Sequence, residues 1–201
     1  MNVTVRASDL GSFDYCQEKW LAMKQGRVAF TPSPQLEAGA RLHRSLDEQF
    51  LAEHPHSIDF EEFIKGEQEG NLRPQATRLR FRAQLGDIQL AGIPDELCYN
   101  QRGLNIIEDK NSLRAYDGYK NQARFYCLTL QLLYPRLATL NMYSMVRNAA
   151  SMQILWEEPY TAESRNTVIS EIHKLRDILM GFVKPTPCKH LPTCVPRQGD
   201  T

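Results

Sequence analysis

Two segments joined by a turn constrain most strongly how this chain can fold. Residues 88–99 and 104–112 are predicted strands, and the run Asn-Gln-Arg-Gly at 100–103 is typical of a turn that folds one strand back onto the next. Side chains two residues apart on a strand share a face, so Glu108 and Lys110 should project together. The pattern therefore predicts a hairpin that carries an acid and a base side by side.

The same hairpin brings a second acid toward the first. Asp95 closes the first strand, and the turn folds its carboxylate back toward that of Glu108. Mg²⁺ prefers one or two carboxylate oxygens, waters and substrate phosphate to a closed cage of protein ligands. We therefore expect Asp95 and Glu108 to share a divalent cation, with Lys110 beside the bound phosphate.

The composition is that of one ordinary globular domain. The chain has 201 residues, 42% of them hydrophobic and 24% charged, which is enough to bury a full core and excludes a disordered chain. Its 24 basic and 24 acidic residues give no net attraction to nucleic acid, so contacts with DNA must come from local basic patches. Residues 1–10 lack the apolar core of a signal peptide and no run is long enough for a membrane helix, so we expect a cytoplasmic protein without membrane contact.

The order of the elements predicts a mixed α/β fold, in which a central sheet is flanked by helices. Within a single domain 1–201 we expect N-terminal helices in 1–56, a catalytic sheet and helix in 72–160, and a last helix with a cysteine-containing tail in 161–201. The predicted helices are 8–26, 35–54, 116–134 and 162–180, and the other predicted strands are 77–84, 136–146 and 151–158, with a turn at Arg147 and Asn148.

Arginines alternate with apolar residues in one of these predicted strands. Arg78, Arg80 and Arg82 share one face of it, and Leu79 and Phe81 share the other. An arginine row on a sheet can bind phosphates, and it can equally be a solvated face. Both interpretations stay open at this point.

Two predicted helices carry polar residues on faces that point toward the sheet. His43 follows a stripe of apolar residues at helical spacing, and a histidine that faces inward is either a hydrogen-bonded core residue or a ligand. Gln122 and Tyr126 lie four residues apart on one face, where they can orient a water or hold a phosphate oxygen, although Tyr126 can also be core packing. Lys120 and Arg124 on nearby turns are candidate phosphate contacts.

Four motifs follow one another along the chain: Gly39-x-x-x-His43, Gly92-x-x-Asp95, Glu108-x-Lys110 after two isoleucines, and Gln122-x-x-x-Tyr126. This order resembles the PD-(D/E)XK nuclease superfamily, and more narrowly its RecB-like branch, which includes the CRISPR-associated exonucleases and exonuclease V. The resemblance implies a restriction-endonuclease-like fold and a Mg²⁺- or Mn²⁺-dependent deoxyribonuclease. Its substrates would be single-stranded DNA or DNA ends, in DNA repair or in CRISPR spacer acquisition.

The resemblance also implies roles for individual residues. The metal would be held by His43, Asp95, Glu108 and the backbone carbonyl of Asp109, and the catalytic residues would be Lys110, Gln122 and Tyr126. The metal would polarise the scissile phosphate and lower the pKa of a bound water, and Lys110 would orient that water or neutralise charge on the phosphorane. Beside a cation, the pKa of Lys110 is expected to be lowered. Expected partners are DNA and other DNA-processing or CRISPR adaptation proteins.

The cysteines indicate a second site. Five cysteines, an odd number without a secretory signal, argue against a disulfide framework and for thiols or thiolate ligands. The related cluster-bearing nucleases pair one N-terminal cysteine with three C-terminal ones; Cys16, Cys188 and Cys194 match these, whereas Pro185 occupies the remaining position. His190 is then the candidate fourth ligand. Three cysteines and one histidine suit Zn²⁺ or an atypical iron–sulfur cluster, of the four-iron four-sulfur type in the related nucleases, and a tail without metal is the alternative.

Two other classes of protein fit the same residues. The first is a catalytically inactive DNA-binding or adaptor subunit with the same fold, and the intact set of acids, lysine, glutamine and tyrosine weighs against it. The second is a small thiolate-metal protein in which the acid pair only forms surface salt bridges. Cys98 and Cys127 have no metal-ligand spacing, so we expect both to be buried thiols.

Overall fold

The computed structural model describes residues 3–29, 34–53, 75–77 and 79–188. Within these residues, groups of helices and groups of strands follow one another along the chain. In chain order the elements are β1 (Val3–Arg6), α1 (Ala7–Tyr15), α2 (Gln17–Lys24), α3 (Pro34–Glu53), β2 (Gln75–Thr77), β3 (Phe81–Leu85), β4 (Ile88–Gly92), β5 (Glu96–Asn100), β6 (Gly103–Lys110), α5 (Asp117–Leu133), the 3₁₀ helix η1 (Pro135–Thr139), β7 (Met142–Asn148), β8 (Ile154–Pro159) and α6 (Ala162–Leu179).

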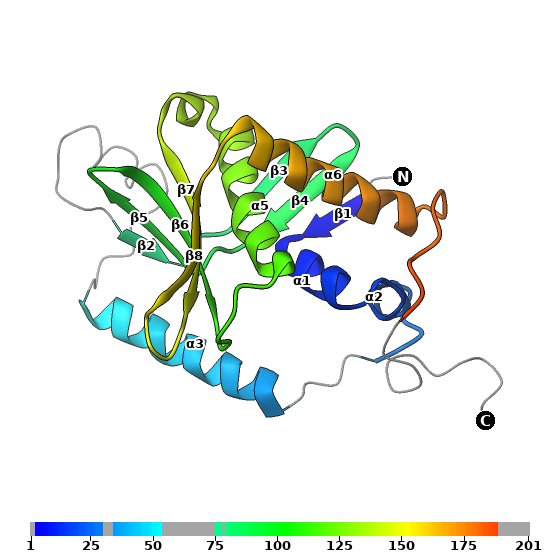
Figure 1. Ribbon diagram of the computed structural model, residues 1–201, viewed down its shortest axis with the longest axis horizontal. Coiled ribbons are helices and arrows are strands. Elements are labelled where there is room, and N and C mark those ends of the chain that lie inside the picture. Colours follow the sequence, from blue (N-terminus) through cyan, green and yellow to red (C-terminus); the bar gives the residue numbers. More distant parts are fainter. Residues whose placement is uncertain (1–2, 30–33, 54–74, 78, 189–201) are drawn as a thin grey trace.

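The strands form two mixed sheets flanked by helices. The larger sheet has the order β2-β5-β6-β7-β8, and the smaller has the order β1-β4-β3. In Figure 1 the large sheet lies on the left and the small one on the right, with α5 between them and α3 beneath the large sheet. The predicted mixed α/β class is therefore confirmed, but two sheets replace the single central sheet that we expected.

The division into two sheets happens inside a segment that the sequence predicted as one strand. Residues 88–99 form β4 in the small sheet and β5 in the large one, and Ile93, Pro94 and Asp95 link the two. Pro94 has no backbone N–H to give to a ladder, which favours a break at this point. Asp95 consequently lies at the junction of the two sheets rather than inside a strand.

Helix α5 holds the two sheets together. It packs against α1 and α6 and against strands of both sheets. Phe125, Leu128 and Leu130 of α5 are completely buried, and they share the main core with Leu97 and Leu104 of the large sheet. The predicted helix 116–134 is thus confirmed to within one residue at either end.

The predicted helix 8–26 is divided into two. Cys16 adopts an extended conformation (φ −164°, ψ 110°) and separates α1 from α2. Asp9 lies in the first turn of α1, and its carboxylate caps the helix by accepting the backbone N–H of Arg6 at 2.8 Å. The same carboxylate accepts the indole N–H of Trp20 at 3.3 Å and pairs with Lys24 at 2.8 Å. The last two contacts tie the start of α1 to α2.

The region around β7 also departs from the prediction. Residues 135–139 form η1 instead of the beginning of a strand, because Pro135 starts a helical turn readily. Strand β7 continues through Asn148, so the predicted turn at Arg147 and Asn148 is wrong. The chain reverses just afterwards, where Met152 has a positive φ of 58°. Arg147 therefore lies on a strand of the sheet and not in a loop.

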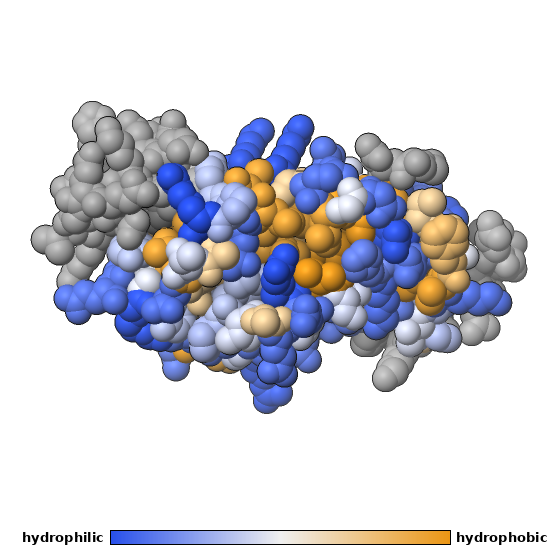
Figure 2. All heavy atoms as spheres, turned by 90° about the horizontal axis from the view of Figure 1, so that it is seen from above, coloured by the Kyte–Doolittle hydropathy of each residue, from blue (hydrophilic) through white to orange (hydrophobic). Residues whose placement is uncertain are grey.

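The surface combines polar and apolar patches. Seen from above, apolar residues gather along the middle of the molecule and hydrophilic side chains surround them (Figure 2). In the part of the chain that the structure describes, no helix is long and apolar enough to cross a membrane.

Candidate functional site

The site begins with two acids that face each other across the hairpin. Glu96 pairs with Ile107 in the antiparallel ladder, so Asp95, one residue earlier, stands opposite Glu108. Directly opposed residues project from the same face of a sheet. Asp95 Oδ2 also accepts the backbone N–H of Asp109 at 2.8 Å, which fixes its carboxylate against β6. The structure therefore brings together the two acids that the sequence singled out.

Glu108 is a buried carboxylate with one oxygen in use. Its side chain is 5% exposed, and Oε1 accepts a hydrogen bond from Lys110 Nζ. The other oxygen, Oε2, is buried and has no hydrogen-bond partner among the described residues. Burial, together with the charge of Asp95, raises the pKa of Glu108 to about 7 although Lys110 opposes this. A buried carboxylate oxygen without a donor is costly, and a cation or a proton at Oε2 would relieve that cost.

Lys110 lies beside Glu108 on the same face, as predicted. Its ammonium also lies 5.0 Å from the ring centroid of Tyr119 on α5, a cation–π contact. Burial lowers the pKa of Lys110, but the charge and the hydrogen bond of Glu108 outweigh burial, so the net shift is upward. The neighbouring carboxylate thus stabilises the ammonium form, and the lowering of this pKa that we expected beside a cation stays a prediction.

Tyr119 is a residue of this site that the sequence analysis missed. It lies three residues before Gln122 and seven before Tyr126, which is the spacing of one helical face. That periodicity could have drawn attention to it. The ring of Tyr119 in turn contacts Tyr116 edge-on, with 5.5 Å between the ring centroids. Tyr116 is 54% exposed, so an aromatic surface borders the lysine.

His43 comes to the site from α3. Its Nδ1 lies 3.2 Å from Asp95 Oδ1, and the hydrogen bond to Asp95 raises the pKa of the histidine against the effect of burial. The imidazole is 29% exposed, so it is half-buried and not part of the core. Where α3 is described at side-chain level, none of its residues is fully buried. His43 thus reaches the acids from a helix with little buried surface.

Asp109 belongs to a different face of β6. Its two carboxylate oxygens accept hydrogen bonds from Arg147 Nε and Nη2 at 2.7 and 2.8 Å, and Nη2 also reaches Glu96 at 2.7 Å. Bonds to Asp109 and the charges of both acids raise the pKa of Arg147 further above its ordinary value, although burial opposes them. The Asp109 carboxylate is therefore fully engaged, which leaves its backbone carbonyl for the role that we predicted. Arg147 is a second residue that the sequence analysis missed.

Tyr126 and Gln122 lie on the face of α5 that points to the sheet junction. The Tyr126 hydroxyl donates to the backbone carbonyl of Ile93 at 2.9 Å. Burial and the charges of Glu108 and Asp95 raise the pKa of Tyr126 well above its ordinary value. A Cβ on Gly92 would lie 2.6 Å from the tyrosine ring, so glycine is needed for this approach.

Gln122 is buried one turn earlier on the same helix. Its side-chain carbonyl oxygen would be 3.2 Å from a Cβ on Gly11, so Gln122 packs against α1. This contact places Gln122 beside α1, one turn nearer the start of α5 than Tyr126. Its predicted catalytic role remains a prediction.

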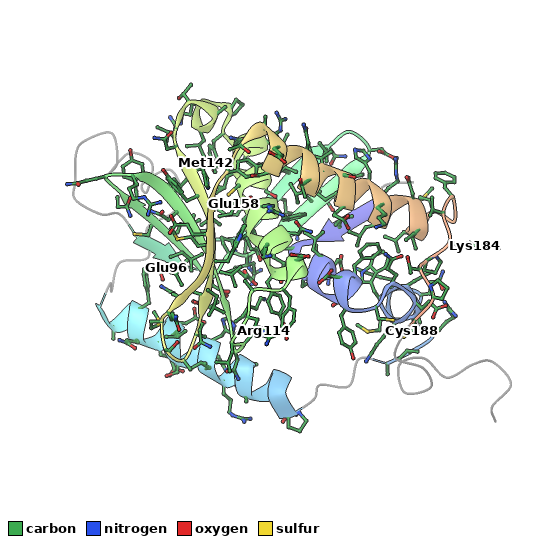
Figure 3. The ribbon with its side chains drawn as sticks, viewed as in Figure 1. Glu96, Arg114, Met142, Glu158, Lys184 and Cys188 are labelled. Atoms are coloured by element: carbon green, nitrogen blue, oxygen red, sulfur yellow. The ribbon has the colours of Figure 1, made fainter. Side chains whose placement is uncertain are left out.

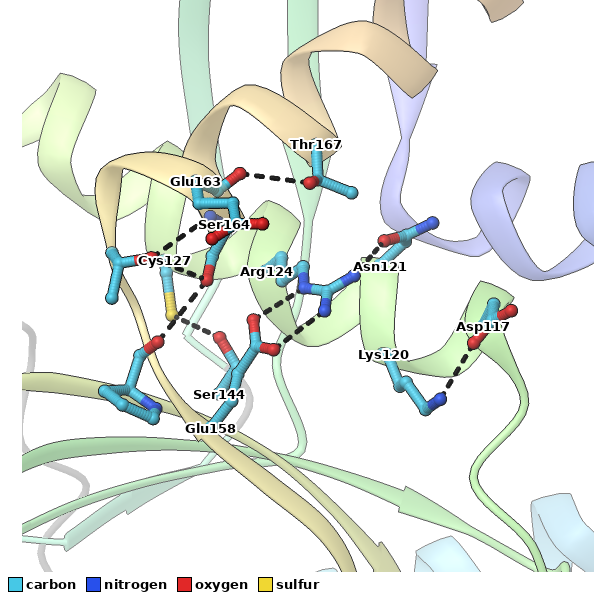
Figure 4. A network of polar contacts seen from close by, with 12 residues as sticks. Asp117, Lys120, Asn121, Arg124, Cys127, Ser144, Glu158, Glu163, Ser164 and Thr167 are labelled. Atoms are coloured by element: carbon cyan, nitrogen blue, oxygen red, sulfur yellow. Dashed lines mark hydrogen bonds and ion pairs between the residues drawn. The ribbon is translucent and has the colours of Figure 1, made fainter.

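Lys120 and Arg124, the candidate phosphate contacts, are occupied by other partners. Arg124 forms two hydrogen bonds with Glu158 at 2.7 and 2.8 Å and one with Asn121 at 2.8 Å (Figure 4). Lys120 pairs with Asp117 at 2.8 Å. The two hydrogen bonds of the Arg124 guanidinium with Glu158 join α5 to β8, so this side chain makes a structural contact.

The two described cysteines of the second site lie together. Cys16 and Cys188 are both buried and form one small cluster, although they come from opposite ends of the chain. The segment that ends at Cys188 lies against α2 (Figure 3). Cys188 N donates to Glu18 at 2.8 Å, and Thr186 N donates to Gln17 at 2.7 Å. The other two predicted ligands, His190 and Cys194, lie outside the described residues.

The remaining two cysteines differ from each other. Cys127 is completely buried, and burial raises its pKa to about 12. Its sulfur lies 3.2 Å from the Ser144 hydroxyl oxygen. Cys98 is only partly buried, so the expectation of two buried thiols is correct for Cys127 alone.

The side chains at the sheet junction are of the types that bind a hard divalent cation. They offer two carboxylates and an imidazole, and Glu108 Oε2 is buried with no hydrogen-bond partner in the described part of the chain. Mg²⁺ and Mn²⁺ favour such oxygen-rich, partly hydrated sites. Within residues 3–29, 34–53, 75–77 and 79–188, no three or more histidine, cysteine or acidic side chains are arranged as a group that could hold a metal ion. Coordination here would therefore depend on waters or substrate oxygens as well as protein ligands.

The fold is similar to that of a solved structure. The crystal structure of a candidate exonuclease from Eubacterium rectale matches with a TM-score of 0.57 at 14% sequence identity, over 94% of this chain and 86% of that chain. The crystal structure of SSO0001 matches with a TM-score of 0.46 at 18% identity, over 90% of this chain and 78% of that chain. The first likeness shows a shared fold, and the second carries no further conclusion. No protein family and no curated protein sequence matches this chain.

Proposed function

We propose that this protein is a Mg²⁺- or Mn²⁺-dependent deoxyribonuclease of the RecB-like PD-(D/E)XK type, which acts on single-stranded DNA or DNA ends. The observation that carries the proposal is the carboxylate of Glu108. One of its oxygens is bound by Lys110, the other is buried without a partner in the described part of the chain, and Asp95 stands directly opposite. The similarity in fold to a candidate exonuclease supports the same proposal.

The residues that would hold the metal are Asp95 and Glu108, with His43 and the backbone carbonyl of Asp109 completing the set. A bound divalent cation would polarise the scissile phosphate and make hydroxide available from water near neutral pH. His43 Nδ1 now contacts Asp95, so it would have to give up this contact to bind the metal. Binding the metal would also require the imidazole to be neutral. Arg147 would keep the Asp109 side chain out of the site, because both its oxygens are already bound on the other face of β6.

Lys110 would act on the substrate. Its ammonium lies between Glu108 and the ring of Tyr119, which limits where the charge can move. A phosphate bound beside Glu108 would find that charge already in position, so negative charge that develops during hydrolysis is balanced without rearrangement. Tyr126, held by the carbonyl of Ile93, would shape the wall of the site.

The cysteine cluster would be a second, structural element of the same proposal. The pairing of Cys16 with Cys188 supports a thiolate site that fastens the tail to α2, with His190 and Cys194 as its other ligands. Zn²⁺ and a four-iron four-sulfur cluster both suit such ligands. Anaerobically purified protein that is brown and absorbs near about 400 nm would favour the cluster, and colourless protein with one zinc per chain would favour zinc.

One observation favours a different function. Each acid of the site is already paired with a cationic side chain, Asp95 with His43 and Glu108 with Lys110. Such pairing is what a catalytically inactive DNA-binding or adaptor subunit would retain, because it stabilises the acids without a metal. An adaptor would bind DNA equally well with and without a divalent cation and would not cleave it.

The test is a cleavage assay on end-labelled single-stranded and duplex DNA with Mg²⁺, Mn²⁺ or EDTA. Cleavage that needs the metal and disappears in Asp95→Ala and in Lys110→Ala supports the nuclease. Lys174→Ala, which removes a half-exposed lysine on α6, serves as the matched control and should cleave like the native protein. Cleavage retained in both site variants would reject the assignment, and native protein that binds DNA without cutting it would favour the adaptor.

A further inference from the structure

Three arginines surround a hollow of 370 Å³ at the edge of the small sheet, next to the proposed active site. Its lining includes Arg6, Arg80, Arg82, Ala91, Ile93 and Tyr126. All three arginines are exposed, and none has an ion-pair partner among the described residues. Among the described residues, no acidic side chain lines the hollow. Arginines around a concave surface, without acids between them, are an arrangement that binds phosphates.

The register of the small sheet explains why these side chains converge. Arg6 of β1 and Arg82 of β3 are both partners of Ala91 in the central strand β4. Residues that share a partner project from the same face, and two strand spacings separate them by about 10 Å. The small Ala91 side chain between them leaves a trough. Long guanidinium groups can reach into it from both sides.

Arg80 extends this trough toward the sheet junction. It lies two residues before Arg82, so it projects from the same side of the chain, and the register continued by one residue places it opposite Ile93. The neighbouring positions along this face toward the other end of the sheet are uncharged: Thr4, Gln84 and Gln89. The positive charge is therefore concentrated at the end of the sheet where the chain crosses to β5.

The trough leads to the acids. Ile93, at its inner end, is two residues from Asp95, which limits the distance between their Cα atoms to about 7 Å. Tyr126 lines the hollow, and its hydroxyl donates to Ile93 O, while the charges of Glu108 and Asp95 act on the same tyrosine. One aromatic side chain thus forms the boundary between the arginines and the carboxylates.

We infer that Arg6, Arg80 and Arg82 form a subsite for the backbone phosphates of a polynucleotide strand, next to the scissile phosphate. The inference rests on the proposed function, since it says how a substrate strand reaches that site. Of the predicted arginine row, Arg80 and Arg82 are thus interpreted as phosphate-binding, and Arg6 joins them from another strand. Arg78 lies outside the described residues. Because the chain has no net charge, such a local patch is how it would attract a polyanion.

Binding is measured in EDTA, so that the result does not depend on cleavage. A fluorescently labelled single-stranded oligonucleotide is titrated with native protein, with the double variant Arg6→Gln/Arg82→Gln and with Arg165→Gln over a range of salt concentrations. Arg165 is an exposed arginine of α6, and its variant removes charge elsewhere. We expect the double variant to bind about tenfold more weakly at low salt, with a slope of log affinity against log salt that is smaller by about 1.4. Arg165→Gln should follow the native protein.

A second variant keeps the experiment interpretable. Arg6→Lys/Arg82→Lys retains both charges and should keep most of the salt slope, whatever the effect of glutamine on folding. Oligonucleotides with a 5′-phosphate and with a 5′-hydroxyl distinguish the source of the phosphate. Equal affinity for the two indicates internal phosphodiesters, and a preference for the 5′-phosphate that the glutamine variant loses indicates a terminal phosphate.

The outcomes separate this inference from the proposed function. Native protein that fails to bind the oligonucleotide, or a double glutamine variant that binds like the native protein, overturns the phosphate subsite even if metal-dependent cleavage is present. Arginine-dependent binding by a protein that does not cleave DNA supports the subsite and rejects the nuclease. Both effects together support both.

Discussion

Two neighbouring acids, on opposite faces of β6, differ in how their carboxylates are hydrogen-bonded. On one face Asp109 has both oxygens bound by Arg147, which also reaches Glu96. On the other face Glu108 has one oxygen bound by Lys110 and the second buried without a partner among the described residues. Both acids are almost completely buried. Burial alone therefore does not distinguish the two acids; the state of their hydrogen bonds does.

The difference assigns a separate task to each face. The Asp109 face is a completed ion-pair network, in which removing one member leaves a buried charge. The Glu108 face keeps an unsatisfied oxygen, a local cost that is typical of sites prepared for a ligand. Substitutions that keep the shape of each acid should thus separate activity from stability.

The largest expected effect is on cleavage. Glu108→Gln should lower the rate of metal-dependent DNA cleavage by about a hundredfold or more, because it removes a charged ligand from the site. Asp109→Asn keeps the backbone carbonyl and should lower the rate per folded molecule by less than about tenfold. The check is single-turnover cleavage with saturating Mn²⁺. Equal losses of cleavage rate in the two variants would show that the two faces of β6 do not differ in their importance for activity.

Stability should show the reverse order. Asp109→Asn leaves the buried guanidinium of Arg147 with an incomplete partner, and we expect it to lower the free energy of unfolding by about 3 kcal/mol. Glu108→Gln also takes a counter-charge from Lys110, but that side chain is 20% exposed and can be hydrated, so the loss should be smaller, about 1 kcal/mol. Urea denaturation in EDTA measures both. A larger loss for Glu108→Gln than for Asp109→Asn would contradict the comparison.

The stability of the protein in EDTA should depend on the protonation of Glu108. Burial raises the pKa of Glu108 from its ordinary 4.5 to about 7, so between these values the folded state binds more protons than the unfolded state. The free energy of unfolding should therefore fall as pH rises from about 5 to about 7. Glu108→Gln should flatten this decline, whereas Asp109→Asn should preserve it. A native profile that rises through this window would show that Glu108 is ionised when folded.

The smallest effect is expected at the helix that contributes least to the core. His43→Gln should weaken Mn²⁺ binding about tenfold, since one ligand is lost while the two carboxylates remain. It should leave the unfolding free energy unchanged, because α3 has no fully buried residue where its side chains are described. Titration calorimetry and denaturation measure the two quantities. Arg44→Gln, on the exposed side of the same helix, is the matched control.

Local pattern was enough for several parts of this site. The alternation of β6 predicted that Glu108 and Lys110 share a face, and the turn before it predicted that Asp95 would stand across from them. Helical periodicity likewise predicted the common face of Gln122 and Tyr126. These predictions succeeded because a strand or a helix repeats its geometry every few residues.

Partners that come from distant segments could not be predicted in the same way. Arg147 was assigned to a turn, and its contact with Asp109 depends on the parallel pairing of β6 with β7, which local pattern does not reveal. Arg124 was a candidate phosphate contact because of its charge and position, but its guanidinium donates to Glu158 of β8. A charged side chain pairs with the opposite charge that the fold brings near, so its partner cannot be predicted before the tertiary structure is known.

The amino-acid sequence by itself determined the spacing of the acids, the lysine and the helix that covers them, and with that spacing the face on which each lies. Only the tertiary structure decided that the strands divide into two sheets at Pro94, that Arg147 binds Asp109, and that Arg6 joins Arg82 across Ala91. The physical reason is range: backbone periodicity acts over a few residues, whereas ion pairs, sheet order and shared pockets form between segments that only the completed core holds together.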